Sequence, residues 1–134
     1  MCNHACDHIC NHICDHICAH QVTSWPCLLN LAATWDAPLT FRFGAALGEE
    51  FSGKGANVIL GPSVNVHRVP RNGRNAEYMS GEDPNLGAPL AAAYVQGVQS
   101  SGVAATVKHF VLNSQETRRD SESSDASDRT LFEA

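Results

Sequence analysis

The alternation of helix-like and strand-like segments between residues 35 and 110 restricts the fold of this chain more than any other feature. Two segments repeat an apolar residue every four positions, which is typical of an amphipathic helix; these residues are Leu39, Phe43, Leu47 and Phe51 in the first and Leu86, Leu90, Tyr94 and Val98 in the second. A short apolar run follows each segment, at 57–62 and at 103–110. This order predicts a βαβ unit with parallel strands and a right-handed crossover, and therefore an α/β fold.

Local signals predict where both helices begin and end. Asp36 and Asp83 are suitable N-caps, and a proline lies in the first turn after each, where its missing N–H costs no hydrogen bond. Glycine favours helix ends, so the first helix is expected to end at Gly53 or Gly55 and the second before Gly102. A third helix is expected to begin in the final segment, "DRTLFEA".

A long polar loop, residues 63–84, is expected to share one rim with the end of the second strand. Loops that leave the carboxyl ends of parallel strands gather on one face, and loops longer than about 12 to 15 residues are commonly functional. The loop carries Arg74, and the strand ends in Lys108 and His109. Their convergence would suit a ligand that is dense in hydroxyl groups or negatively charged. The alternative is that Lys108 and His109 simply leave the core for solvent.

Composition narrows the classes of partner. The chain has 134 residues and a formal net charge of −5, and its Lys and Arg residues form no basic run, which argues against a nucleic-acid surface. No apolar stretch approaches the roughly 18 residues of a membrane helix, and the first twenty residues lack the pattern of a secretory signal. These observations predict neither a nucleic-acid nor a membrane partner, and they leave the compartment and the oligomeric state open.

The amino-terminal segment, "CNHACDHICNHICDHICAH", repeats a four-residue Cys-x-His unit. Thiolate and imidazole groups can bind Zn²⁺ or Cu⁺, but structural zinc sites usually separate two ligand pairs by a long loop, which is missing here. We therefore interpret residues 1–21 as a low-complexity tail, disordered or artefactual, and assign no metal ligand. A Cys/His-rich metal-binding protein remains an alternative. Residues 22–134 are expected to form the folded unit.

Four segments occur in the order "TSWPCLLNLAATWD", "GKGANVILGPSVNVHRVPRNGRNAEYMSGEDP", "YVQGVQSSGVAATVKHFVLNSQETRR" and "DRTLFE". Together they resemble the amino-terminal barrel domain of glycoside hydrolase family 3, the β-glucosidase-like enzymes. The resemblance implies part of a (β/α)₈ barrel, retaining hydrolysis that releases terminal β-D-glucosyl or related residues, and no metal or organic cofactor. It also favours an exported parent protein.

The same resemblance implies a role for three residues. By matching motifs, Arg74 of "GRN" and Lys108 and His109 of "KHF" would hold hydroxyl groups of the sugar beside the cleaved bond of a β-glucoside or oligosaccharide. Such contacts accelerate hydrolysis only if they strengthen as the sugar ring approaches an oxocarbenium ion. In the "GRNAE" segment, Ala76 stands where the family usually has an aromatic residue.

The catalytic pair of the family is missing from the sequence. Neither its Ser-Asp-Trp-like nucleophile segment nor its acid/base domain occurs, and the repeat replaces a substrate-binding Asp expected before "TSWP". Four local carboxylates could substitute, but Asp83 is better explained as a helix cap and Glu82 as favourable charge at a helix start; the set is Glu77, Glu82, Asp83 and Glu116. We therefore assign no catalytic residue.

Length supports the same interpretation, because a complete barrel takes about 250 residues. The chain is expected to be a fragment that folds poorly alone and turns over no glycoside. A carbohydrate-binding remnant without chemistry is the remaining alternative.

Overall fold

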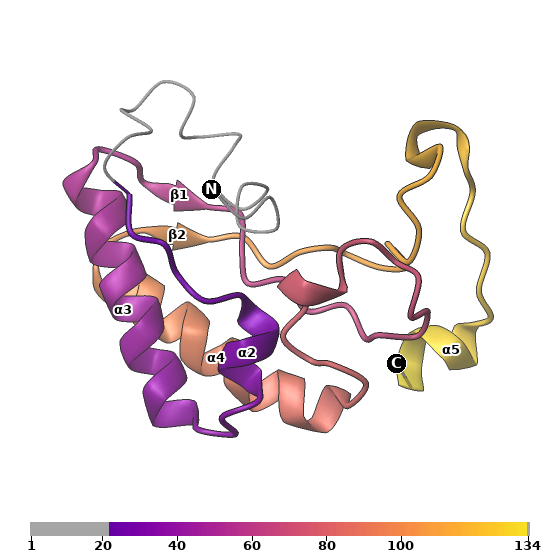
Figure 1. Cartoon of the computed structure of the whole chain (residues 1–134), viewed down its shortest axis with the longest axis horizontal. Coiled ribbons are helices and arrows are strands. Elements are labelled where there is room, and N and C mark those ends of the chain that lie inside the picture. The colour runs from indigo at the N-terminus through magenta and orange to yellow at the C-terminus, as the bar shows by residue number, and fades with distance from the viewer. Residues whose placement is uncertain (1–21, 134) are drawn as a thin grey trace.

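Two long helices lie side by side beneath a small parallel sheet (Figure 1). The structure is a computed structural model that describes residues 22–133, so the repeat of residues 1–21 and the prediction that it is a disordered tail lie outside the described residues. The elements are α2 (Leu28–Ala32), α3 (Ala37–Gly53), β1 (Val58–Ile59), η1 (Asn75–Glu77), α4 (Pro84–Ser100), β2 (Ala104–Ala105), η2 (Arg119–Ser121) and α5 (Asp128–Glu133). The α/β prediction is confirmed.

Both predicted helix starts are confirmed. The Asp36 side chain accepts a hydrogen bond of 2.8 Å from the Leu39 N–H at the start of α3. The Asp83 side chain likewise accepts one of 2.9 Å from the Asn85 N–H at the start of α4. Each carboxylate satisfies a backbone donor that has no partner inside its helix.

The two helices pack through a close backbone contact. An ideal Cβ built on Gly97 of α4 would lie 2.2 Å from the Phe41 carbonyl oxygen of α3, and one built on Gly44 would lie 2.5 Å from the Tyr94 carbonyl oxygen. Glycine therefore lets the helix backbones approach each other. The apolar stripes close around this contact, with Phe43, Leu47 and Phe51 of α3 and Leu90, Tyr94 and Val98 of α4 all buried.

The predicted strands exist and are parallel, but they are shorter than the apolar runs. Val58 pairs with Ala104 and Ile59 with Ala105. The pairing resumes at Ser63, which bridges in parallel to both Lys108 and Tyr78. Pro62 lies between the two pairings and has no N–H to donate to a ladder. The result is a short sheet whose extension reaches Lys108.

The sheet buries one face and exposes the other. Ile59 is fully buried in the core, whereas Val58 and Leu60 are 38% and 37% exposed on the opposite face.

The short helix α2 had no counterpart among the predicted elements, and its Leu28 and Leu31 join the core. The segment after β2 extends away from α3 and α4 before it reaches α5 (Figure 1). No helix within residues 22–133 combines the length and apolar character needed to cross a membrane.

Candidate functional site

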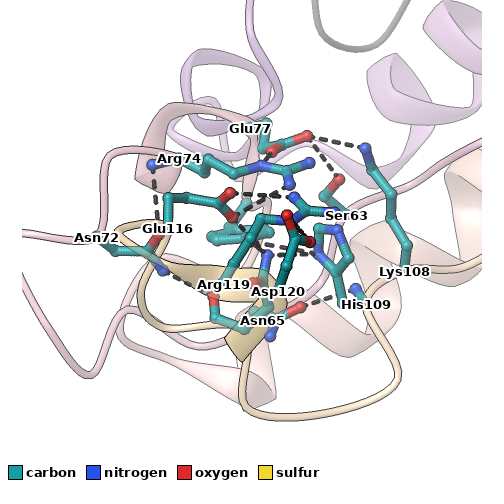
Figure 2. Close-up of polar contacts among 12 residues, drawn as sticks. Ser63, Asn65, Asn72, Arg74, Glu77, Lys108, His109, Glu116, Arg119 and Asp120 are labelled. Carbon is teal, nitrogen blue, oxygen red and sulfur yellow. Dashed lines mark hydrogen bonds and ion pairs between the residues drawn. The ribbon is translucent and has the colours of Figure 1, made fainter. Parts of the chain in front are cut away.

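Arg74, Lys108 and His109 belong to one cluster, whose side chains Figure 2 shows around Glu77 and Glu116. Arg74 immediately precedes η1 in the 63–84 loop, whereas Lys108 and His109 follow β2. The loop and the strand extension are joined by the Ser63–Lys108 bridge, where the Lys108 N–H donates to the Pro62 carbonyl at 3.0 Å. The predicted convergence of the three side chains thus has a backbone cause, although their role toward a substrate stays a prediction.

Glu77 is the centre of the cluster and only 5% exposed. One carboxylate oxygen accepts a hydrogen bond from the Arg74 Nε–H, and the other lies 3.0 Å from the Lys108 Nζ and 3.2 Å from the Ser63 hydroxyl. Burial acts to raise the pKa of Glu77, but hydrogen bonds and charge attraction from the two cations outweigh it and hold that pKa below its usual value. Glu77 is therefore ionised and tied to both cations.

Glu116 holds the other side of Arg74. Its Oε1 lies 3.2 Å from the Arg74 Nη1 and accepts a hydrogen bond of 3.1 Å from the Asn113 side chain, while its Oε2 accepts one of 3.0 Å from Arg119. Partial burial acts to raise the pKa of Glu116, and these donors lower it on balance. The Arg74 guanidinium is thus clamped between two carboxylates and is 15% exposed.

His109 is held by its backbone and by one ring nitrogen. Its N–H donates to the Asn65 side chain at 2.8 Å, and its Nδ1 lies 3.2 Å from the Tyr78 hydroxyl and 3.3 Å from the Asn113 amide nitrogen. Because an amide NH₂ can only donate, Nδ1 accepts and the proton of the neutral ring is on Nε2. Burial, followed by the charges of Arg74 and Lys108, lowers the pKa of His109.

This environment predicts that the folded chain loses stability in mild acid. His109 stays neutral in the fold at pH values where the unfolded chain, with a pKa near 6.5, already binds a proton. The unfolded state therefore takes up more protons, and the free energy of unfolding should fall as pH drops through and below about 6.5. Urea unfolding at pH 7.5, 6.5 and 5.5 measures this slope.

His109→Gln is the control for the pH prediction, since it leaves every other histidine in place. The difference between its slope and that of the wild-type chain isolates the His109 contribution. A variant slope as steep as the wild-type slope would contradict the depressed pKa.

The charges of the cluster compensate each other. Two partly buried cations face two carboxylates, while Arg119, which is 54% exposed, also lies 4.0 Å from Asp120. A compensated cluster attracts anions weakly, but it still presents N–H donors of fixed direction. A cavity of 170 Å³ opens beside His109, lined by residues 64–66, 68, 109–112 and 114 and by Thr130 and Leu131 of α5. Hydrogen bonding to a neutral, hydroxyl-rich molecule is the chemistry that such groups support.

The local carboxylates divide into two classes. Asp83 caps α4 as predicted, and Glu82 is exposed beside it. Glu77 and Glu116, the other two candidates for a substitute catalyst, instead anchor the cluster. Their signals in the sequence are weak: Glu77 follows Arg74 by three residues in one turn of 3₁₀ helix, and Glu116 follows Asn113 by three. Ala76, between Arg74 and Glu77, is exposed.

Within the described part of the chain, no three His, Cys, Asp or Glu side chains gather as they would around a metal ion. The Cys/His repeat lies outside that part.

The chain is similar to one protein family over most of its length. A family model described as the glycosyl hydrolase family 3 N terminal domain matches residues 16–133. A beta-glucosidase from Rhizobium radiobacter is 55% identical over 108 residues, and beta-glucosidase BoGH3A from Bacteroides ovatus is 50% identical over 111 residues. These matches cover 81% and 83% of this chain but only 13% and 15% of the two relatives.

Solved structures give the same likeness. Beta-glucosidase 3B from Thermotoga neapolitana, in complex with alpha-D-glucose, matches 70% of this chain at 49% identity with a TM-score of 0.68. DesR, a beta-glucosidase from Streptomyces venezuelae in complex with D-glucose, matches 75% at 36% identity with a TM-score of 0.72. The chain spans 13% of the length of each.

Proposed function

The chain belongs to glycosyl hydrolase family 3, and from this premise we propose that it forms the sugar-holding part of a β-glucosidase. The whole enzyme would release terminal β-D-glucosyl or related residues with retention, using a nucleophile and an acid/base that lie outside these 134 residues. The proposal covers the activity of a protein several times longer than this chain, as its relatives are.

One observation carries the proposal: Arg74, Lys108 and His109 meet in a single charge-compensated cluster. Lys108 is 14% exposed, and its ammonium group has three donors, of which Glu77 engages one through the contact of 3.0 Å. The Nε2–H of His109 and the outer N–H groups of Arg74 add further donors. Sugar hydroxyls accept such hydrogen bonds, and the glucose bound in the similar solved structures is a ligand of this chemistry.

The finer description of the fold is part of the same proposal. We place β1 and β2 in the first part of a (β/α)₈ barrel, with residues 22–134 as its folded portion. Two features support this arrangement. The strands are parallel, and α4 is the crossover between them. Val58 and Leu60 also expose an apolar sheet face, which would point into the barrel interior and be covered once further strands closed the barrel.

The contribution to catalysis would be electrostatic and positional. In a retaining mechanism positive charge develops at the anomeric carbon, and hydroxyl contacts that tighten as the ring flattens lower the barrier more than they improve ground-state binding. Arg74 and Lys108 are fixed by carboxylates before any sugar arrives, so less side-chain entropy is lost on binding. The cluster would thus orient the ring for groups supplied elsewhere.

Lys108→Ala is expected to weaken glucose binding by the chain about tenfold or more, because it removes a charged donor and leaves Glu77 with one cation fewer. Titration calorimetry or NMR titration with glucose measures the effect. Lys54→Ala is the matched control, since Lys54 precedes β1 and so lies at the end of the strands opposite to Lys108. The Lys54→Ala variant should bind glucose with the affinity of the wild-type chain. Equal affinities of both variants, or no glucose binding by the wild-type chain, would contradict the proposal.

A further inference from the structure

Glu77 occupies a place that the proposed sugar contacts do not explain. Its carboxylate is 5% exposed, and the two cations and Ser63 approach it from different sides (Figure 2). A buried carboxylate is costly unless it is paired and hydrogen-bonded, and here both oxygens have partners. The side chain therefore faces its own cluster and acts on a ligand only through Arg74 and Lys108.

Removal of this carboxylate would change the cluster in two ways. Arg74 would keep one carboxylate, Glu116, but Lys108 has no other acidic partner within the described residues. Lys108 is also long and flexible, so without Glu77 it would lose a fixed direction. In addition, the two partly buried cations would outnumber the one remaining carboxylate, Glu116, and leave a net positive charge beside the site. Glu77 thus fixes the direction of Lys108 and supplies one of the two negative charges that balance the cations.

We infer that Glu77 is a positioning and specificity-determining residue of the proposed sugar site: its buried carboxylate fixes Arg74 and Lys108 and, together with Glu116, cancels their charge, so that the site accepts a neutral pyranose in preference to an acidic one. This inference rests on the proposed function for its ligand. It does not require Glu77 to touch the sugar.

Glucose and glucuronate are suitable probes, because they share a pyranose ring and differ only at C6, which is a hydroxymethyl carbon in glucose and a carboxylate carbon in glucuronate. Glu77→Gln keeps the size of the side chain and removes its charge. Its affinity for glucose is expected to fall about tenfold, while its preference for glucose over glucuronate should shift about tenfold toward the acid. High salt should reduce this shift, since it screens the uncompensated charge.

Two variants separate charge from packing. Glu77→Asp keeps the charge on a shorter side chain, so it should bind glucose more weakly with the wild-type sugar preference. Glu49→Gln makes the same chemical change on the exposed face of α3 and should leave both affinities unchanged. An unchanged preference in Glu77→Gln, or a shifted preference in folded Glu77→Asp, would overturn the inference. The Asp variant decides the question if the Gln variant does not fold.

A second readout needs no sugar and so separates this inference from the proposed function. The Arg74 Nε–H donates to Glu77, so its proton should exchange with water more slowly than that of the exposed Arg71 in ¹H–¹⁵N NMR spectra, and Glu77→Gln, which leaves only a neutral acceptor, should reduce the difference. If slow exchange is found but glucose does not bind, the proposed function fails and the positioning role stands. Equal exchange at Arg74 and Arg71 in the wild-type chain would overturn the positioning role itself.

Discussion

Gly97→Ala is expected to lower the free energy of unfolding by about 3 kcal/mol or more, the upper end of the range for overpacked sites. The added Cβ would lie 2.2 Å from the Phe41 carbonyl oxygen and 2.8 Å from the Ala45 nitrogen. Both are backbone atoms of α3, so no side chain can rotate away and the helices must separate. Separation would open the buried contact between Phe43 and Tyr94, whose ring centroids lie 6.1 Å apart.

Urea unfolding followed by circular dichroism measures this effect, and Gly53→Ala is its matched control. Gly53 is the last residue of α3, and an added Cβ there would meet no atom within 4 Å. Alanine favours helix more than glycine does, so this control should keep or slightly raise the stability, by up to about 1 kcal/mol. A Gly97→Ala midpoint equal to the wild-type value would show that the helix contact is looser than described.

The 134-residue chain is expected to release no p-nitrophenol from p-nitrophenyl β-glucoside above the uncatalysed rate. Retaining hydrolysis needs a carboxylic acid whose pKa is raised so that it can protonate the leaving group. The carboxylates of the cluster have the opposite property, because arginine, lysine and amide donors lower the pKa of Glu77 and of Glu116. Both carboxylate oxygens of Glu77 are also buried and engaged by Arg74, Lys108 and Ser63, so neither is available as a nucleophile.

A full-length family member, such as the beta-glucosidase from Rhizobium radiobacter, is the positive control for this assay. Hydrolysis that scales with the concentration of the chain and disappears in Glu77→Gln or Glu116→Gln would contradict the prediction. Such a result would make one of these carboxylates catalytic in spite of its ion pairs.

The helices could be predicted because their signals are local. A carboxylate at the N-cap, a proline in the first turn and an apolar residue every fourth position act within one or two turns, and α3 and α4 begin where these signals place them. The strands were predicted with less accuracy. An apolar run indicates burial, but ladder pairing depends on a partner strand, and the paired residues are fewer than the runs at 57–62 and 103–110.

Some residues of the site could likewise be predicted from the sequence, and others could not. Three site residues could be predicted from the resemblance and from the rule that the carboxyl ends of parallel strands and the loops that follow them lie on one face of the sheet: Arg74, Lys108 and His109. Glu77 could not be placed, because its partners Lys108 and Ser63 are distant in the sequence and approach it only through the strand extension. The His109 tautomer depends on the amide of Asn113, which is only four residues away but reaches the ring through a turn that has no sequence signal of its own.

Local sequence therefore accounts for the helices, their caps and the α/β order, because those interactions join residues a few positions apart. The pairing of Lys108 with Glu77 and of Arg74 with Glu116, and the approach of α3 to α4 at Gly97, belong to the tertiary structure alone. Both arise when chain packing brings distant groups within hydrogen-bond or van der Waals range, and a linear pattern does not encode that distance.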